Sequence, residues 1–307
     1  MSALDPQKGI DAGAFQRPLG SLAETIAQKL QREAPRLLPA PEYVAVDMFF
    51  MVRQALYTYS LLFYLASEER RQRDPYLMNE YSMIASQTVR SMIDALYNIT
   101  LILDDPGANG VRFRKSGFKK LYRNLDEDEE RYGGQPEWDS YIAIQRSVAD
   151  RGMKESKLAR PDLLVDSDWL TLGAYLGQKQ PGGTLSSHQQ FLKTFTYGVW
   201  REYSAISHGG FEGLINIARY LAPDVVPHEL RTVTDEQFVF INSLHLFRAA
   251  YILLCIVTEV QLYFHFLDAN IDSRIHAMWG ILIKNFETRE LYDQRYADLM
   301  KARGINP

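Results

Sequence analysis

The sequence predicts an all-α protein, built as a bundle of long antiparallel helices with shorter helices inserted between them. Three observations lead to this class. Apolar residues recur at helical spacing over long segments, capping-box spacings precede several of these segments, and no alternating strand pattern bounded by hairpin turns occurs. Because 46% of the 307 residues are hydrophobic, the chain can also bury a substantial core.

Three helices are predicted in the first third of the chain. Ser21 and Glu24 have the capping-box spacing, so the first helix is expected to begin there and residues 1–20 to form a flexible polar tail. A proline opens a second helix over 42–71, which is rich in Ala, Leu, Met and aromatic residues. The third helix covers about 77–103 and ends at an Asp-Asp-Pro-Gly run.

Residues 104–187 are expected to form an exposed insertion within one helical domain that covers 21–307. The periodicity weakens in this segment, where the acidic run Asp126–Glu130 and the Gly-Gly-x-Pro sequence that follows predict an exposed break. Two shorter helices are predicted beyond the break, around 138–157 and 166–176.

Two long helices are expected at the end of the chain. Thr234 and Gln237 repeat the capping-box spacing ahead of an apolar helix that runs to about Asp268. Asp272 can cap a final helix that runs to Arg303.

The composition favours a cytoplasmic protein that does not span a membrane. Cys255 is the only cysteine and lies in an apolar run, so a disulfide framework cannot form and a reducing compartment is expected. The N-terminal residues lack the basic and apolar segments of a signal peptide. The most apolar stretch, 238–266, contains Asn, His, Arg, Glu and Gln, which predicts a buried helix rather than a membrane span. With a net charge of −4, any polyanion site must be local.

One helix combines an arginine and a histidine on a single face. Arg201 and His208 are seven positions apart, which at 100° per residue puts them within about 20° of each other and about 10 Å apart along the axis. Thr194, Tyr197 and Ser204 share this stripe, whereas the apolar residues of the helix cluster on a separate arc. Core packing therefore does not explain the stripe.

Two interpretations of the stripe remain open. A guanidinium can hold a phosphate with two parallel hydrogen bonds and an imidazole can transfer protons at neutral pH, so Arg201 and His208 could together cleave RNA without a metal. Tyr197 or Ser204 would then position the substrate. Equally, a basic residue near the end of a helix, followed by glycines, is an ordinary helix terminus with its polar face in water.

A second pair of charges is expected to be half-buried. Arg90 and Asp94 share a helix face with Met83, Tyr97 and Leu101, so they should be hydrogen-bonded to each other. An arginine four residues before an acid is the less favourable orientation within a helix, which favours a tertiary role. The pair is either an internal ion pair that fixes helix packing or part of a site.

The clearest polyanion signal is a basic segment without acidic residues, between 111 and 123. Aromatic residues alternate with its basic residues, a pattern that suits phosphates and stacked bases. The predicted polyanion-binding residues are Arg112, Arg114, Lys115, Lys119, Lys120 and Arg123. The alternative is an amphipathic helix whose aromatic residues lie in the core and whose charges are neutralised by the acidic run downstream.

At Arg201 and His208 the chain resembles the HEPN superfamily, all-helical bacterial and archaeal domains with an arginine, four to six residues and a histidine on a late helix. The six residues between Arg201 and His208 fit the long form of this motif.

The chain also resembles a HEPN-like bacterial family that has an Arg-x-x-x-acid helix and a later serine ahead of the histidine. Arg90 and Asp94 match the first of these features, and Ser204 or Ser207 matches the second. In outline the resemblance covers 42–265.

The resemblance implies a metal-independent endoribonuclease or a nucleotide-binding protein of a toxin–antitoxin or phage-defence system. It also implies a homodimer in which the two motifs face each other, with RNA or a nucleotide and an antitoxin or defence protein as partners. Glu202 follows Arg201 at a position where active members commonly have a small polar residue, so its carboxylate is expected to repel RNA.

Other chemistries lack their sequence signals. The chain has no Glu-x-x-His pair, no Cys/His zinc pattern, no Gly-rich phosphate loop and no nucleophile elbow, so no metal and no cofactor are expected. His245 falls on an apolar stripe and is expected to be a core histidine. Two classes of function therefore remain: a dimeric RNA-cleaving enzyme, and a non-catalytic helical module that binds a nucleotide, a peptide or a second subunit.

Overall fold

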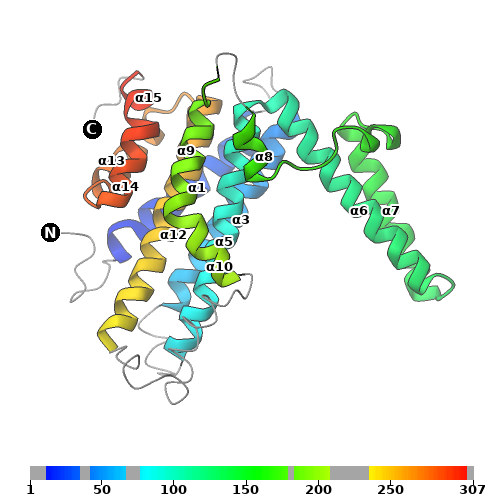
Figure 1. Cartoon of the computed structure of the whole chain (residues 1–307), viewed down its shortest axis with the longest axis horizontal. Helices are drawn as coiled ribbons and strands as arrows, with labels where there is room; N and C mark the ends of the chain where they lie inside the picture. The colour runs from blue at the N-terminus through cyan, green and yellow to red at the C-terminus, as the bar shows by residue number, and fades with distance from the viewer. Residues whose placement is uncertain (1–11, 35–41, 67–76, 179–182, 208–234, 303–307) are drawn as a thin grey trace. The chain divides into compact units, whose positions relative to one another are not determined.

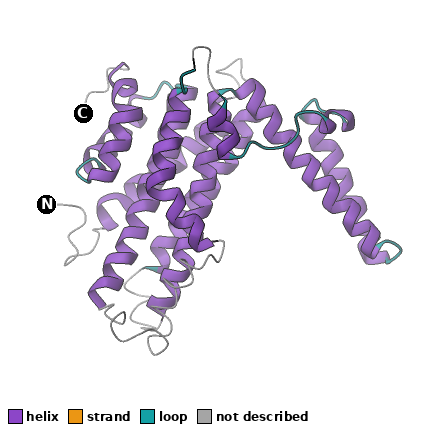
Figure 2. Ribbon diagram, viewed as in Figure 1, coloured by secondary structure: helices purple, strands orange, loops and turns teal. Residues whose placement is uncertain are grey.

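The computed structural model describes residues 12–34, 42–66, 77–178, 183–207 and 235–302. Every secondary-structure element within these ranges is helical, and the ranges contain no strand (Figures 1 and 2). The prediction of an all-α bundle is therefore confirmed.

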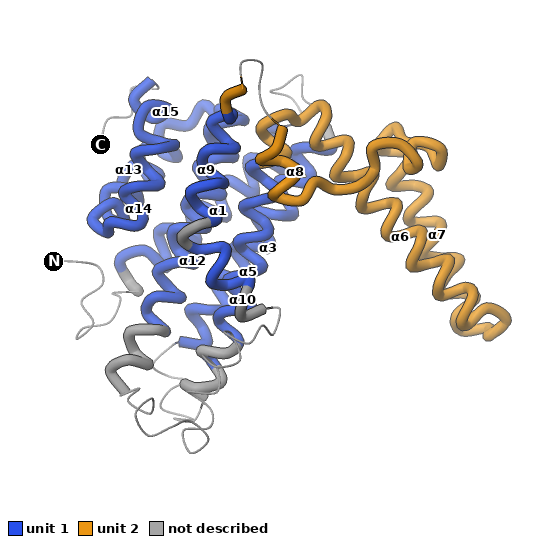
Figure 3. Tube along the Cα trace, viewed as in Figure 1, with its two compact units in different colours: residues 1–100, 185–307 blue, residues 101–184 orange. Residues whose placement is uncertain are grey.

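The chain divides into two compact units (Figure 3). Unit 1 comprises Met1–Thr100 and Leu185–Pro307, and unit 2 comprises Leu101–Thr184. Unit 2 is continuous in sequence and covers nearly the same residues as the predicted insertion, whereas unit 1 is assembled from both ends of the chain.

Unit 1 is centred on three helices that pack against one another: α1 (Ala12–Arg32), α3 (Glu42–Leu65) and α12 (Asp235–Phe264). The residues of α12 from Ala249 to Val257 are completely buried. A helix that is apolar on all sides is stable in water only when neighbouring elements cover it. The segment Asn242–Phe264 is long and apolar enough to cross a membrane, and 89% of its most apolar window is buried inside the protein.

The other described elements of unit 1 are α5 and the helices that follow residue 185. They are α5 (Leu77–Asp104), whose residues 101–104 belong to unit 2, α9 (Ser187–Phe195), the π-helical turn η3 (Thr196–Trp200), α10 (Arg201–Ser207), α13 (Ala269–Leu282), α14 (Phe286–Leu291), the π-helical turn η5 (Tyr292–Tyr296) and α15 (Ala297–Ala302). The first three of the later elements, α9, η3 and α10, form one continuous helical segment. Thr234, the predicted cap of α12, lies outside the described residues.

The predicted start of the first helix at Ser21 is wrong. α1 begins at Ala12, so part of the predicted tail is helical. Phe15 and Leu19 are buried and extend the apolar face of the helix toward its N-terminus, and such packing stabilises helical turns more than local signals do. Ser21 lies inside the helix, where its carbonyl oxygen accepts a hydrogen bond from the hydroxyl of Thr25 at 2.8 Å.

The single final helix predicted over Asp272–Arg303 is also wrong. Asp268, rather than the predicted residue, caps α13, and its carboxylate accepts a hydrogen bond from the backbone N–H of Asn270 at 3.1 Å. The chain leaves the helix after Leu282, and Asn285 caps α14 in the same way. These local bonds from side chain to backbone interrupt a segment whose apolar periodicity is continuous.

Unit 2 is built around a helical hairpin. α6 (Val111–Tyr132) and α7 (Pro136–Glu155) lie antiparallel, and Gly134 in the turn between them has a φ of +85°, a region that favours glycine. The small core consists of Tyr122, Ala149, Met153 and Leu163, with Phe118 and Leu158 packed against it. The other elements of the unit are the π-helical turn η1 (Pro106–Gly110), the 3-10 helix η2 (Arg160–Leu164) and α8 (Leu172–Gly177).

Two expectations for unit 2 are corrected. The acidic run Asp126–Glu130 is largely exposed but belongs to α6, where Arg146 of α7 binds two of its carboxylates at 2.7 and 2.6 Å. The expected exposed break lies after it, at residues 133–135. The helix predicted over 166–176 is shortened to α8, because Asp166 has a φ of +48° and cannot continue a right-handed helix. The helix predicted around 138–157 corresponds to α7.

Candidate functional site

The guanidinium of Arg90 joins two helices that are far apart in the sequence. Its Nε and Nη2 donate to the two carboxylate oxygens of Asp94, one turn later on α5, at 3.2 and 2.6 Å. Its Nη1 donates to the hydroxyl of Ser204 on α10 at 2.6 Å. The pairing with Asp94 is bidentate, a geometry that only an arginine can supply.

An aromatic ring covers the same guanidinium. The guanidinium carbon of Arg90 lies 4.7 Å from the ring centroid of Trp200, the last residue of η3, within range of a cation–π contact. The Arg90 side chain is 14% exposed and the Asp94 side chain 49%. The prediction of a half-buried, hydrogen-bonded Arg90–Asp94 pair is confirmed. We refer to Arg90, Asp94, Trp200 and Ser204 as the Arg90 cluster.

The structure brings only some of the predicted catalytic and supporting residues together. Ser204 joins Arg90 and Asp94 in the Arg90 cluster, whereas Arg201 is exposed at the start of α10. Tyr197 lies in η3, and His208 lies outside the described residues.

The π-helical turn η3 changes the predicted stripe. A π-helical turn contains more residues than an α-helical one, so α9 and α10 do not share one continuous register of 100° per residue. Thr194 precedes this turn and Arg201 and Ser204 follow it. The single stripe predicted through Thr194 and Ser204 is therefore wrong in its register. Such turns are frequent at functional sites.

Glu202 has a partner that the sequence did not reveal. One of its carboxylate oxygens accepts a hydrogen bond from Nη1 of Arg248 on α12 at 2.8 Å. The Arg248 side chain is 9% exposed, and its Nε lies 3.6 Å from a carboxylate oxygen of Glu287. The negative charge of Glu202, which was expected to repel RNA, is thus opposed by a buried arginine.

His245 is a core histidine, as predicted. It is 6% exposed, and the hydroxyl of Tyr203 lies 2.7 Å from its Nδ1. Burial, and after it the charge of Arg248, lowers the pKa of His245 to about 4. The imidazole is therefore neutral at physiological pH.

The basic segment of α6 is largely engaged within unit 2. Three of its residues form ion pairs and two form other hydrogen bonds. The sixth, Lys120, is exposed, and so are Lys119 and Arg123 among the paired residues. The ion pairs are Arg112 with Asp166 at 3.5 Å, Lys119 with Asp168 at 2.8 Å and Arg123 with Glu127 at 3.7 Å. The other hydrogen bonds run from Arg114 to the Ser156 hydroxyl at 2.8 Å and from Lys115 to the Val165 carbonyl at 3.3 Å. This pattern favours the amphipathic-helix alternative.

The aromatic residues between these basic side chains also pack within unit 2. Phe113 contacts Trp169 edge to face with ring centroids 5.1 Å apart, Tyr122 belongs to the small core, and Phe118 packs against that core. In the same unit, the guanidinium of Arg160 lies 3.5 Å from the ring centroid of Tyr122. Rings that pack in this way do not present open faces to stacked bases.

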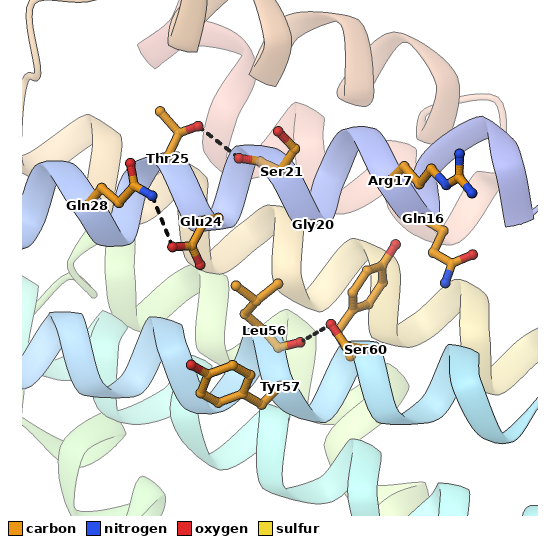
Figure 4. Close-up of a pocket in the computed structure, with 11 residues that line it drawn as sticks. Gln16, Arg17, Gly20, Ser21, Glu24, Thr25, Gln28, Leu56, Tyr57 and Ser60 are labelled. Atoms are coloured by element: carbon orange, nitrogen blue, oxygen red, sulfur yellow. Dashed lines mark hydrogen bonds between the residues drawn. The ribbon is translucent and has the colours of Figure 1, made fainter.

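A groove of about 600 Å³ lies between α1 and α3 (Figure 4). Gln16, Arg17 and Gln28 line it from α1, and Leu56 and Tyr57 from α3. None of the predicted site residues contributes to this lining.

The least exposed ion pair in the described residues, Arg295 with Glu259, was not predicted from the sequence. Arg295 donates from Nε and Nη2 to the two carboxylate oxygens of Glu259 at 2.9 and 2.8 Å, and from Nη1 to the hydroxyl of Ser187 at 2.6 Å. The two charged side chains are 5% and 1% exposed. The sequence signal for this pair is the acidic residue within the apolar run of α12.

Replacing Arg90 by lysine is expected to lower the free energy of unfolding by about 1 kcal/mol, because an ammonium cannot bind Asp94 bidentately and also reach Ser204. Urea denaturation followed by circular dichroism measures the change. Arg201→Lys, on the exposed face of the neighbouring helix, is the matched control and should stay within about 0.5 kcal/mol of the wild type. Equal losses in both variants would show that the Arg90 cluster does not hold α10.

The fold and this geometry define an all-helical protein in which a half-buried Arg–Asp–Ser–Trp cluster joins α5 to the segment that carries Arg201. Comparisons with protein-family models, with curated proteins and with solved structures found no match to the chain. The function must therefore be argued from the residues themselves.

Proposed function

We propose that this chain is a metal-independent endoribonuclease of the HEPN type that acts on RNA through Arg201 and His208. One observation carries the proposal. The two motif segments of the resemblance are separated by more than a hundred residues, yet Arg90 of the first donates a hydrogen bond to Ser204 of the second at 2.6 Å. Segments that share a site must meet in space, and these two do.

In the proposed reaction Arg201 binds the scissile phosphate and His208 transfers protons. The 2′-hydroxyl of the preceding nucleotide loses its proton to a base and its oxygen bonds to phosphorus, while the bond from phosphorus to the 5′-oxygen breaks. The 5′-oxygen takes up a proton and the other fragment keeps a 2′,3′-cyclic phosphate. His208 serves as the acid or the base of these two transfers, and Arg201 stabilises the charge on the phosphate.

Two further features support this assignment. The carboxylate of Glu202 is paired with Arg248, which reduces its repulsion of a phosphate held by Arg201. In addition, the π-helical turn η3 ends immediately before Arg201, and π-helical turns within helices are frequent at functional sites. A toxin or phage-defence setting, with an antitoxin or defence protein as partner, belongs to the same proposal.

A second candidate is a non-catalytic module that binds a nucleotide or a protein partner. It is favoured by the hydrogen bonds of Arg90 to Asp94 and Ser204, because they give this arginine a structural role in joining two helices. The two candidates differ in their need for a titrating imidazole. His208→Asn should abolish cleavage in an enzyme and leave partner binding nearly intact in a binding module.

The test is cleavage of labelled total RNA in the presence of EDTA, which silences contaminating metal nucleases. We expect His208→Ala to lower the cleavage rate by about 10²–10⁴-fold, the usual contribution of a general acid or base. Arg201→Ala should lower it by about 10²–10³-fold, the usual loss when one group that stabilises the charge of the transition state is removed. Arg123→Ala, which removes an exposed arginine of unit 2, should cleave at the wild-type rate.

Three outcomes would contradict the assignment of RNA cleavage to Arg201 and His208. Equal cleavage by all the variants would identify a contaminant. Loss in Arg123→Ala alone would move the site to unit 2. RNA binding by a wild-type protein that does not cleave would favour the second candidate.

A further inference from the structure

The outward face of α3 carries an apolar stripe in two halves, on either side of Arg53 and Gln54. Its members are large side chains that remain exposed: Val46 (43%), Phe50 (64%), Tyr57 (61%), Leu61 (46%) and Tyr64 (58%). At 100° per residue all five fall within about 60° of the helix circumference. The opposite face of α3 packs on α1 and α12, so among the described residues this helix is apolar on both sides, and the side chains of its outward face remain exposed.

The stripe is symmetric about the middle of the helix. Phe50 and Tyr57 lie at equal distances from the point between Arg53 and Gln54, and so do Val46 and Leu61. Tyr43 and Tyr64 form a third pair about the same point. If two α3 helices pack antiparallel with their centres at this point, each residue of a pair in one copy faces the other residue of that pair in the second copy.

The spacing of the aromatic residues also suits helix pairing. Tyr43, Phe50, Tyr57 and Tyr64 recur every seven residues, which is the repeat of a helical seam that faces one partner helix along its length. A surface that is complementary to itself is what a two-fold symmetric interface requires, because each copy must offer the same patch to the other.

We propose that this stripe is a homodimer interface in which the α3 helices of two copies pack antiparallel, with the two-fold axis between Arg53 and Gln54. Phe50 of each copy then packs against Tyr57 of the other, and Val46 against Leu61. The proposal rests on α3 alone and does not depend on the ribonuclease assignment.

The charge at the proposed axis is compensated within each copy. Arg53 forms an ion pair with Glu24 of α1, and its guanidinium carbon lies 5.6 Å from the ring centroids of Phe49 and Tyr57. When two copies pair, the two Arg53 side chains near the axis are therefore each already paired with a Glu24 carboxylate. No member of the stripe is itself charged, which favours a protein partner with the same apolar surface.

The size of the stripe fits a dimer of modest affinity. An aromatic side chain has about 150–250 Å² to bury, so three rings that are about 60% exposed leave on the order of 300–400 Å² uncovered. With the two aliphatic residues the stripe reaches roughly 500 Å² per copy, at the upper end of the apolar patches found on monomers. Two copies would together bury roughly 1,000 Å², the least that a specific interface needs.

The groove between α1 and α3 adjoins the stripe and supplies a polar rim. Tyr57 belongs to the stripe and also lines the groove, where Gln16, Arg17 and Gln28 of α1 lie (Figure 4). Arg17 and Gln28 are exposed. An apolar centre beside hydrated polar side chains is the usual anatomy of an interface.

The experiment is sedimentation equilibrium of the full-length chain over a range of concentrations. We expect the wild type to reach about 71 kDa, twice the 35.3 kDa of one chain. Phe50→Glu and Tyr57→Lys should each raise the dimer dissociation constant at least 100-fold, because each buries charges against the partner's ring. Ile144→Glu, at an equally exposed apolar residue of α7 (62%), is the matched control and should dimerise like the wild type.

Mixing the two variants tests the register of the pairing. A Phe50→Glu chain and a Tyr57→Lys chain place a glutamate opposite a lysine on one side of the axis and keep the native pair on the other. The mixture should therefore recover a heterodimer that neither variant forms by itself.

Three results would overturn the proposal: a wild type that stays monomeric at every concentration, a Phe50→Glu dimer as tight as the wild type, or a mixture that remains monomeric although both variants melt like the wild type. A monomeric wild type that binds phospholipid vesicles through the stripe would assign this face to a lipid surface instead.

Discussion

Replacing Arg295 by methionine is expected to lower the free energy of unfolding by about 3–5 kcal/mol, because the carboxylate of Glu259 would be left buried without its partner. Two guanidinium nitrogens now bind that carboxylate, and a third binds the Ser187 hydroxyl. Methionine fills a similar volume, so the loss measures the unpaired charge rather than a cavity. Urea denaturation at neutral pH, with the midpoint and slope both fitted, gives the change.

The control is the exposed arginine–glutamate pair of α6. Arg123 and Glu127 have side chains that are 67% and 52% exposed, so Arg123→Met should cost no more than about 0.5 kcal/mol. Adding Glu259→Gln to Arg295→Met should recover part of the lost stability, since a neutral amide is cheaper to bury than a carboxylate. A loss in Arg295→Met no larger than that of Arg123→Met would mean that the pair is not buried in solution.

The same pair contributes a stability that depends on pH in a definite direction. Burial alone would raise the pKa of Glu259, but the charge and hydrogen bonds of Arg295, with a smaller contribution from His188 at 3.7 Å, outweigh it and hold the pKa below its ordinary value. The folded protein therefore keeps this carboxylate ionised at a pH where the unfolded chain protonates it. The contribution is complete above the unfolded pKa and is lost as the pH falls through the folded one.

Apolar periodicity was sufficient to predict the long helices because each buries one face or all of its surface. The predicted starts at 42 and 77 match α3 and α5, and α12 begins where the capping box was expected. The errors lie where another interaction decides the boundary. α1 extends to Ala12 because Phe15 and Leu19 are packed, and the last helix is interrupted at a cap that periodicity does not detect.

Only the contacts of the candidate site that lie within one helix were predictable from the sequence. Arg90 and Asp94 are four residues apart on one helix, so their pairing follows from helical geometry. The third member, Ser204, came from the resemblance, since no local rule connects α5 with α10. The pairing of Glu202 with Arg248 depends on how α10 docks on α12 and has no local signal in the sequence.

The basic segment of α6 illustrates the opposite error, in which a sequence signal overstates a site. Six basic residues without an acid among them suggest a polyanion surface, but the carboxylates that balance some of them come from elsewhere. Asp166 and Asp168 lie more than forty residues later and return to α6 through the fold of unit 2. A run of like charges therefore predicts a binding surface only after the tertiary partners are known.

Acidification is expected to destabilise the protein through His245 by about 3 kcal/mol between pH 6.5 and 4, since its folded pKa is about 4 and one pKa unit corresponds to about 1.4 kcal/mol. Between these values the unfolded chain binds a proton that the folded chain does not, so the free energy of unfolding falls as the pH falls. The cause is burial first and the charge of Arg248 second.

The measurement is the free energy of unfolding in urea at half-unit steps from pH 7.5 to 4, compared between wild type and variants. His245→Gln keeps a hydrogen-bonding group near Tyr203 but cannot titrate, so its stability should fall less steeply than that of the wild type. Tyr203→Phe loses the hydroxyl but keeps the buried imidazole, so it should be less stable at every pH and retain the wild-type slope. If His245→Gln and the wild type fell in parallel, the imidazole would have to be hydrated in solution, and the carboxylates alone would account for the acid sensitivity.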